Sequence, residues 1–120
     1  MIAYSTPGTN DLDRAIIFYD VAFSAIGKIT SPEWTQYGRP GDEGKVCIVL
    51  PFNGDNATNG NGTMLAFEVG DYDRVNGFHA AALKSGGSDQ GNPGIREQTH
   101  FVAYVRDPDG NKLCVFTKRK

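Results

Sequence analysis

The chain has 120 residues, of which 39% are hydrophobic and 22% charged, a composition typical of one globular domain. Its formal net charge of −2 argues against nucleic acid or an acidic membrane surface as a partner, because both attract strongly basic proteins. No apolar run is long enough to cross a membrane, and two cysteines are too few for a disulfide scaffold. We therefore expect a cytoplasmic protein.

The first half of the chain predicts a strand, a helix and a hairpin, in that order. Residues 1–6 are β-like, and Asn10 or Asp11 can cap the helix that follows. Apolar residues at spacings of three and four give this helix one buried face: Leu12, Ala15, Ile16, Tyr19, Phe23 and Ile26. The elements expected next are a weak strand at 28–30 and two hairpin strands, 34–38 and 45–51, around a turn at 39–44.

The second half repeats this order after a linker. Residues 53–62 are dense in Asn and Gly and show no periodicity, so we interpret them as the linker. The elements expected after it are a strand at 63–69, a helix capped by Asp71, a loop at 86–99, and hairpin strands at 100–105 and 113–117. The apolar stripe of the second helix includes Val75, Phe78, Ala82 and Leu83, and His79 is expected to face solvent.

The turn of the last hairpin has the sequence Asp-Pro-Asp-Gly-Asn. Pro108 presets φ at the second position, Asp107 can bond its own backbone, and Gly110 can adopt a positive φ. We interpret this segment as a structural turn without a chemical role.

The two halves are copies of one module. Tyr37 matches Tyr104 and Cys47 matches Cys114 at a constant offset of 67 residues, and the segment from Asp11 has its own match 60 residues downstream. Such self-similarity indicates a duplicated supersecondary unit. The sequence thus predicts one α+β domain over 1–120, with two tandem βαβββ modules, about 1–55 and about 60–120, that form a cleft between mixed four-stranded sheets.

Alternation along the strands assigns side chains to the sheet face away from the helix, which we call the open face. In the second hairpin the expected residues are His100, Val102, Tyr104, Cys114 and Phe116, provided that Arg106 pairs with Lys112. The other expected residues are Ile2, Tyr4, Thr6, Glu33, Thr35, Tyr37, Cys47, Val49, Met64, Ala66 and Glu68. A slip of one residue would invert any of these sets. Trp34 is expected in the core.

Three stretches resemble the vicinal oxygen chelate superfamily, which includes glyoxalase I, bleomycin-resistance proteins, fosfomycin-resistance transferases and extradiol dioxygenases. Residues 10–19, Asn-Asp-Leu-Asp-Arg through Phe-Tyr, are similar to the family's first-helix signature. Residues 63–69, Thr-Met-Leu-Ala-Phe-Glu-Val, are similar to its Thr-His-x-Ala-Phe-x-Val strand, and residues 106–114 resemble its closing hairpin. With the duplication, the resemblance spans essentially the whole chain.

The resemblance also implies a place for one divalent metal ion. Family members that use a metal hold it with a His on the first strand of each module and a carboxylate on the last strand. Here these positions carry Tyr4, Met64 and Cys114, and Cys47 is the duplicate of Cys114. A phenol and a thioether are poor ligands for hard or borderline cations, so we expect no metal site and no cofactor of this kind.

The favoured interpretation is a homodimer that binds a small molecule in the cleft, as the bleomycin-resistance branch does. The expected ligand-binding residues are Tyr4, Tyr37, Cys47, Met64, Glu68, Val102, Cys114 and Phe116. The alternative is a glyoxalase-like lyase, isomerase or dioxygenase. It would use His100 and Tyr104 as acid and base, or a shifted metal site of His100 with Glu68 or Glu33.

Two further alternatives stay open at the level of sequence. Cys47 and Cys114 are small buried hydrophobes in one reading, and soft ligands for Cu(I) or Zn²⁺ together with Met64 in the other. The chain could also be an interaction module whose own side chains fill the cleft.

Overall fold

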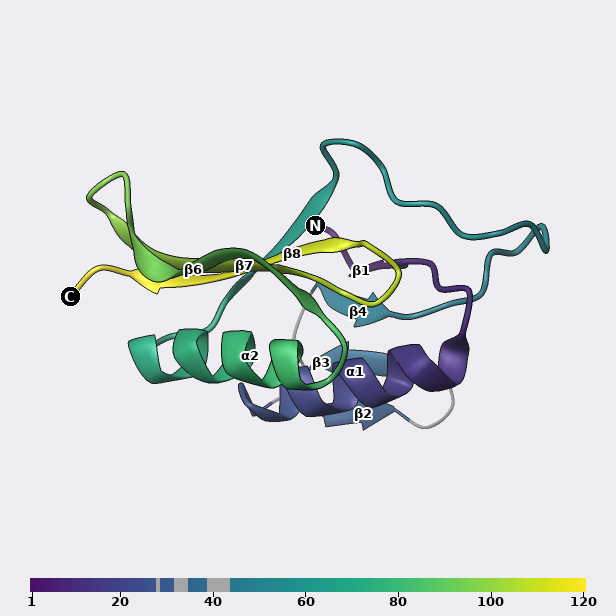
Figure 1. Cartoon of the computed structure of the whole chain (residues 1–120), viewed down its shortest axis with the longest axis horizontal. Helices are drawn as coiled ribbons and strands as arrows, with labels where there is room; N and C mark the ends of the chain where they lie inside the picture. Colours follow the sequence, from purple (N-terminus) through teal and green to yellow (C-terminus); the bar gives the residue numbers. More distant parts are fainter. Residues whose placement is uncertain (28, 32–34, 39–43) are drawn as a thin grey trace.

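The computed structural model describes residues 1–27, 29–31, 35–38 and 44–120. Its elements are β1 (Tyr4–Ser5), α1 (Leu12–Ser24), β2 (Ile29–Ser31), β3 (Gln36–Gly38), β4 (Lys45–Cys47), β5 (Met64–Glu68), α2 (Tyr72–Lys84), β6 (Ser88–Arg96), β7 (His100–Arg106) and β8 (Lys112–Lys118). The strands form two four-stranded sheets, ordered β1-β4-β3-β2 and β5-β8-β7-β6 (Figure 1). In each sheet the first strand pairs in parallel and the others antiparallel, so the predicted α+β fold with two βαβββ modules is confirmed.

Both helices begin where the repeat predicts. The side chain of Asp11 accepts a hydrogen bond from the Arg14 N–H at 3.0 Å, and Asp71 accepts one from the Arg74 N–H at 2.8 Å. Each carboxylate satisfies a backbone donor of the first helical turn and lies at the positive end of the helix dipole. None of the described helices combines the length and the apolar character needed to cross a membrane.

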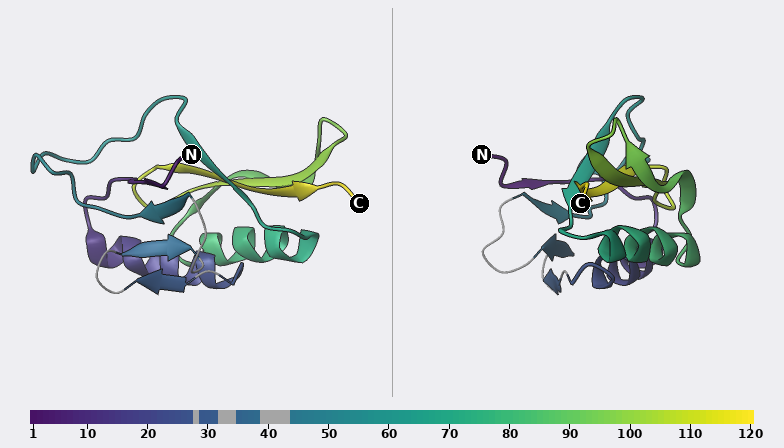
Figure 2. Two further views of the ribbon diagram at one scale, coloured as in Figure 1. Left: turned by 180° about the vertical axis from the view of Figure 1, so that it is seen from behind. Right: turned by 90° about the vertical axis from the view of Figure 1, so that its left-hand side faces the viewer.

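The two helices pack against each other and lie along the same side of the β5-β8-β7-β6 sheet (Figures 1 and 2). Phe23 of α1 is the aromatic ring that connects the modules. Its centroid lies 5.3 Å from that of Tyr37 in β3, 5.2 Å from Phe67 in β5 and 5.7 Å from Phe78 in α2. One continuous hydrophobic core therefore spans both copies of the repeat.

The register of the first hairpin corrects one prediction. Tyr104 pairs with Cys114 in the second hairpin, but Tyr37 pairs with Val46 and Gln36 pairs with Cys47 in the first. This difference of one residue turns Tyr37 to the helix side, because side chains alternate along a strand. Tyr37 is buried, and its hydroxyl donates a hydrogen bond to Asp20 of α1 at 2.8 Å. The expectation that Tyr37 lies on the open face is therefore wrong.

Three predictions in the second module are also wrong. Residues 88–96 form the strand β6 instead of a loop, with register shifts between Asp89 and Gly91 and between Gly91 and Gly94 that accommodate the glycines. His79 is buried instead of solvent-facing, and its Nε2 lies 2.9 Å from Asp89 Oδ1. This contact joins α2 to β6. Leu83, expected in the apolar stripe, is 39% exposed.

Three further predictions concern residues outside the described part of the chain: Glu33 on the open face, Trp34 in the core, and residues 39–43 of the turn expected at 39–44.

The Asp-Pro-Asp-Gly-Asn turn connects the second module to the first. The buried carboxylate of Asp107 accepts a hydrogen bond from the Tyr19 hydroxyl at 2.6 Å. It accepts three more at 2.9 Å: one from the Asp109 N–H, one from the Asn111 N–H and one from the Asn111 side-chain amide. Burial, and then the negative charge of Asp107, raise the pKa of Tyr19 well above its usual range. The structural interpretation of this turn agrees with these bonds.

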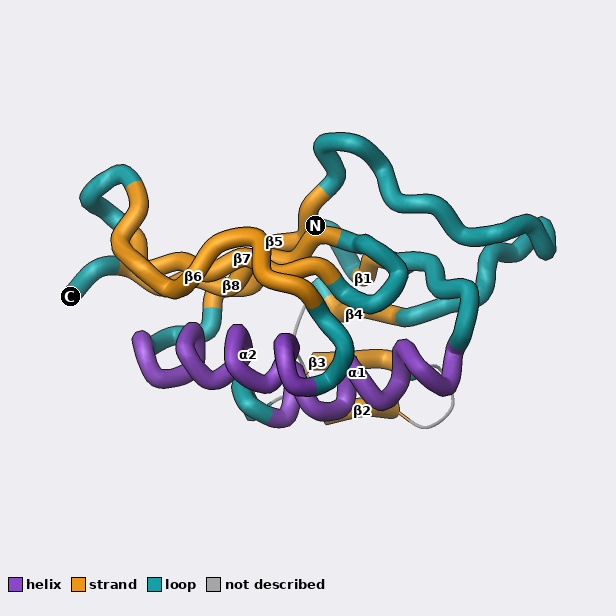
Figure 3. The backbone as a smooth tube through the Cα atoms, in the orientation of Figure 1, coloured by secondary structure: helices purple, strands orange, loops and turns teal. Residues whose placement is uncertain are grey.

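The same turn also holds the start of α1. Asp109 accepts hydrogen bonds from the backbone N–H of Asn10 at 3.0 Å and from the Arg14 guanidinium at 2.9 Å. The long loop between β4 and β5, teal in Figure 3, passes the same region, where Asn10 and Ala57 exchange two hydrogen bonds. The N-terminus of α1 is thus fixed by segments from the linker and from the second module.

Candidate functional site

The open face of the β5-β8-β7-β6 sheet carries a cavity of about 420 Å³. Its lining residues are Arg96, Glu97, His100, Val102, Tyr104, Cys114 and Phe116, and we call it the β7–β8 cavity. Val102 pairs with Phe116 and Tyr104 with Cys114, so four of these side chains come from two adjacent cross-strand pairs. The structure thus brings together the five residues that alternation places on this face of the second hairpin.

Glycines of β6 make room for the aromatic wall of this cavity. A Cβ atom added at Gly91 would lie 2.8 Å from Cδ2 of Tyr104, so the absence of a side chain lets the tyrosine ring lie against β6. A Cβ added at Gly94 would lie 2.7 Å from Nη1 of Arg96, whose Nη2 donates to the Asn92 carbonyl at 2.8 Å. The glycines that suggested a loop in the sequence therefore position two lining side chains.

Arg96 and Glu97 are lining residues that the sequence did not reveal. Arg96 is the last residue of β6, and Glu97 begins the turn into β7. The sequence pattern assigns this segment to a loop. Glu97 has a φ of 51° and Gln98 a φ of 61°, so two non-glycine residues occupy the left-handed region in this turn. The backbone strain of these two residues is located at the edge of the cavity.

His100 is the first residue of β7, and its side chain has one hydrogen-bond partner in the described part of the chain. Its Nδ1 is 2.8 Å from the Thr99 hydroxyl, and its ring contacts the Phe116 ring edge-to-face at 5.6 Å. The carboxylate of Glu68 instead accepts a hydrogen bond from the Gly70 N–H at 2.7 Å. Nothing among the described residues therefore orients His100 as a general base through a carboxylate.

The two cysteines are buried and free. Burial raises the pKa of Cys114 to about 11, although the nearby positive charge of Lys112 acts in the opposite direction. The thiol is consequently protonated at neutral pH and is a poor nucleophile. Cys47 Sγ lies 3.7 Å from the side-chain nitrogen of Gln36, its cross-strand partner.

The side chains at the metal positions of the resemblance do not fit a divalent ion. Tyr4 is 60% exposed and Met64 is 42% exposed, and they offer a phenol and a thioether. Within the described residues, no three His, Cys, Asp or Glu side chains come close enough together to hold a metal. Tyr4 and Met64 supply no imidazole, carboxylate or thiol, the donor groups of divalent transition-metal sites in proteins.

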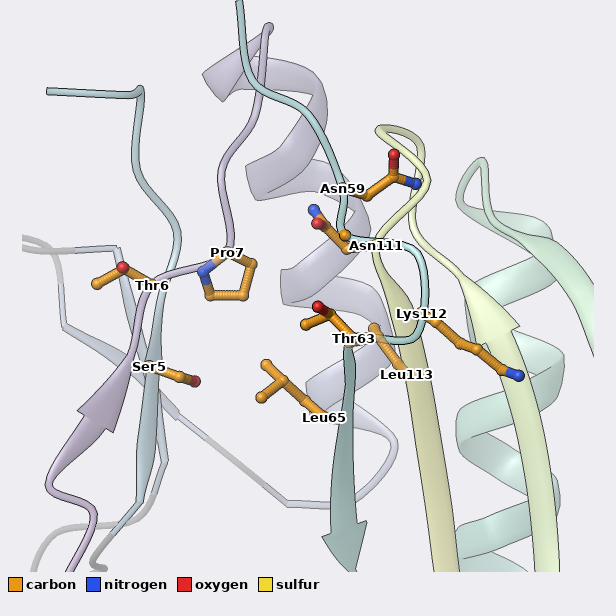
Figure 4. Close-up of a pocket in the computed structure, with 10 residues that line it drawn as sticks. Ser5, Thr6, Pro7, Asn59, Thr63, Leu65, Asn111, Lys112 and Leu113 are labelled. Carbon is orange, nitrogen blue, oxygen red and sulfur yellow. The ribbon is translucent and has the colours of Figure 1, made fainter. Parts of the chain in front are cut away.

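A smaller cavity of about 180 Å³ lies between the two modules, and we call it the junction cavity (Figure 4). It is lined by Ser5, Thr6, Pro7, Asn59, Gly60, Thr63, Leu65, Asn111, Lys112 and Leu113, none of which was expected to bind ligand. Ligand pockets usually measure about 300–1,000 Å³. The β7–β8 cavity is therefore the better candidate for a functional site.

Comparisons with known proteins show that solved structures share this fold and that the sequence matches a family model. The model of the Glyoxalase/Bleomycin resistance protein/Dioxygenase superfamily matches residues 4–115. A glyoxalase/bleomycin resistance protein from Albidiferax ferrireducens T118 is 34% identical, with a TM-score of 0.88 and 99% of each chain covered. No curated protein matches.

Two more distant solved structures share the fold. A glyoxalase-related enzyme from Fulvimarina pelagi is 22% identical with a TM-score of 0.75, and 98% of this chain and 87% of that chain are covered. TnmS3, an antibiotic binding protein from Streptomyces sp. CB03234, is 19% identical with a TM-score of 0.67, and the coverage is 99% and 96%. With the family match over 4–115, these likenesses lead to one conclusion: the chain belongs to the glyoxalase/bleomycin resistance protein/dioxygenase superfamily.

Proposed function

We propose that this protein binds a small organic molecule in the β7–β8 cavity, without the divalent metal that some relatives use. The observation that carries the proposal is the cavity of about 420 Å³ on the open face, walled by His100, Tyr104 and Phe116. Pockets for small molecules are mostly apolar and aromatic, with a few placed polar groups. The Tyr104 hydroxyl and the His100 ring are such groups at the wall of this cavity.

A binding role has more support than a catalytic one. TnmS3, which has the same fold, is described as an antibiotic binding protein. Among the described residues His100 is hydrogen-bonded to Thr99 and to no carboxylate, and the Cys114 thiol has a pKa raised to about 11, so this part of the chain activates neither as a base or nucleophile. A lyase or isomerase acting through His100 and Tyr104 remains the alternative.

We further propose that two copies associate so that a second chain covers the open faces. A single chain leaves Ile2 72% exposed, Tyr4 60% exposed and Met64 42% exposed, all at or beside the edge strands β1 and β5. Exposed apolar groups of this kind mark interaction surfaces when they are contiguous. Sedimentation equilibrium would give twice the mass of one chain, and a monomer at micromolar concentration would refute the dimer.

The binding proposal can be tested with N-phenyl-1-naphthylamine, a neutral aromatic dye whose fluorescence rises in apolar sites. The wild-type protein should bind one dye per chain, and Phe116→Ala should weaken binding because it removes a ring from the cavity wall. Phe101→Ala is the matched control. Phe101 precedes Val102 on β7 and stacks on Tyr72 of α2 at 4.1 Å, so it lies on the helix side of the same sheet.

Loss of dye binding in Phe116→Ala with retention in folded Phe101→Ala would support the proposal. Equal binding by both variants, or no saturable binding by the wild type, would overturn it. Dye binding should also survive chelators. One tightly bound Zn, Ni, Mn or Fe per chain, lost together with dye binding, would contradict the metal-free part of the proposal.

A further inference from the structure

The open face of the β5-β8-β7-β6 sheet is rich in positive charge. Its cationic residues are Arg96 at the end of β6, Arg106 on β7, and Lys112 and Lys118 on β8. The last three belong to the same alternating positions as Tyr104 and Phe116, and Arg96 lines the β7–β8 cavity. For a chain with a net charge of −2, this is a local concentration of cations.

The cations are not neutralised by carboxylates of the described chain. The ion pairs among the described residues are Arg14–Asp109, Arg74–Asp71 and His79–Asp89, and none involves these four side chains. Two carboxylates share this surface. The Glu68 carboxylate accepts a hydrogen bond from the Gly70 N–H, and Glu97, exposed in the turn after β6, lines the β7–β8 cavity together with Arg96.

Two of these cations oppose each other directly. Arg106 pairs with Lys112 across β7 and β8, and like charges in such a pair cost stability. The Arg106 guanidinium is held by the Gly110 carbonyl at 2.6 Å and by the Gln90 side chain at 3.3 Å. These two bonds fix the position of the guanidinium.

Lys112 extends toward the β7–β8 cavity. Its ammonium nitrogen lies 5.2 Å from the centroid of the Tyr104 ring, which forms part of the cavity wall. In Figure 4 the Lys112 side chain points away from Pro7 and the junction cavity, although its residue borders that cavity. A positive charge thus lies over the Tyr104 ring, at the wall of the cavity.

We propose that the ligand of the β7–β8 cavity is an organic anion, a planar aromatic molecule whose ring lies against Tyr104 and Phe116 and whose acidic group meets the ammonium of Lys112. This inference rests on the proposed function, because it names the chemistry of the molecule that the cavity takes. Arg96 is a second cation in the lining of the cavity, next to the carboxylate of Glu97 in the sequence.

Two dyes that differ by one charge test this inference. The first is 1-anilinonaphthalene-8-sulfonate, and the second is N-phenyl-1-naphthylamine, the same ring system without the sulfonate. The wild-type protein should bind the sulfonate about tenfold more tightly than the neutral dye, a difference of about 1.4 kcal/mol. Raising the salt concentration should weaken binding of the sulfonate dye and leave the affinity for the neutral dye unchanged, since salt screens the charge interaction.

The variant Lys112→Met keeps an unbranched side chain and removes the charge. It should bind the sulfonate about tenfold more weakly and the neutral dye within about twofold of the wild type. Lys84→Met is the matched control, because Lys84 is exposed at the end of α2, on the other side of the sheet, and should leave both dyes unaffected. Phe116→Ala should weaken the binding of both dyes, because both are expected to occupy the same cavity.

The outcomes separate the two proposals. Equal affinity for the two dyes, no effect of salt and no selective effect of Lys112→Met would overturn the anionic ligand while the binding function stands. If neither dye binds the wild type, both proposals fail. The salt dependence is measured on the wild type, so it decides the question even if Lys112→Met does not fold.

Discussion

Replacing Tyr19 by phenylalanine removes one hydrogen bond from a buried carboxylate and keeps the ring. The Tyr19 hydroxyl donates to Asp107 at 2.6 Å, and Tyr19 is completely buried. Hydrogen bonds to charged groups stabilise the folded state by about 1.5–3 kcal/mol. Asp107 keeps three other donors in the variant, so we expect a loss toward the lower end of this range, about 2 kcal/mol.

Urea unfolding followed by circular dichroism measures this loss directly as a change in the free energy of unfolding. In a thermal melt, about 2 kcal/mol should lower the Tm by about 6–10 °C for a chain of this size. Tyr72→Phe is the matched control. The Tyr72 hydroxyl accepts only an exposed hydrogen bond from the Lys120 N–H at 3.1 Å, and its ring stacking is kept, so the change should be within about 0.5 kcal/mol.

The effect of Tyr19→Phe should also depend on pH. Burial and the charge of Asp107 raise the pKa of Tyr19 in the folded state, so the unfolded chain loses this phenolic proton first, near pH 10. Above that pH the unfolded state binds fewer protons than the folded state, and the stability of the wild type falls as pH rises. The variant lacks this decline, so the gap between the two proteins should narrow. A Tyr19→Phe loss no larger than that of Tyr72→Phe, or a gap that widens above pH 10, would refute the reasoning.

Three further predictions concern other parts of the structure. Gly87→Ala should destabilise the protein by about 1–3 kcal/mol in urea unfolding, because the added Cβ would lie 2.7 Å from Cε2 of the buried Phe18 ring; a neutral change would contradict this packing. The hydrogen bond from His79 lowers the pKa of Asp89, so this contact stabilises the fold above about pH 4 and the stabilisation is lost as pH falls below that value. Acid titration of Asp89→Asn should accordingly show a smaller loss of stability than the wild type, and equal losses would exclude the contact. Cys114, whose pKa is raised to about 11, should react with iodoacetamide at pH 8 only after unfolding, and rapid labelling of the native protein would contradict its burial.

The fold could be predicted because the sequence contains the same module twice. The matching Asp-x-Asp-Arg segments predicted both helix starts, where Asp11 and Asp71 act as caps. The family resemblance, carried by motifs in both halves, agrees with the match over residues 4–115. Local signals that recur at equivalent places in two modules reinforce each other, so the order of elements followed from the sequence.

The first hairpin shows where the repeat misleads. Alignment of the halves places Tyr37 on Tyr104, but the strand pairing differs by one residue between the copies. The register of a hairpin depends on its turn, and a single-residue change inverts the strand without altering its apolar content. Tyr37 was therefore assigned to a ligand face while it packs against α1.

The β7–β8 cavity was predictable only in part. Alternation along β7 and β8 placed His100, Tyr104 and Phe116 together, because a regular hairpin needs only its register. Arg96 and Glu97 were missed because Gly and Pro residues made β6 read as a loop, whereas the bulged strand uses glycines to admit neighbouring side chains. Their place at the cavity depends on contacts that no local pattern records.

The most direct test of the binding site is nuclear magnetic resonance with the ¹⁵N-labelled protein titrated with 1-anilinonaphthalene-8-sulfonate. Binding in the β7–β8 cavity predicts saturable shifts for the amides of 100–104 and 114–116, with one dye per chain. The amides of Ser5, Thr6 and Asn59, beside the junction cavity, should move little. Largest shifts at the junction cavity, or weak shifts spread over the surface without saturation, would contradict the proposed site.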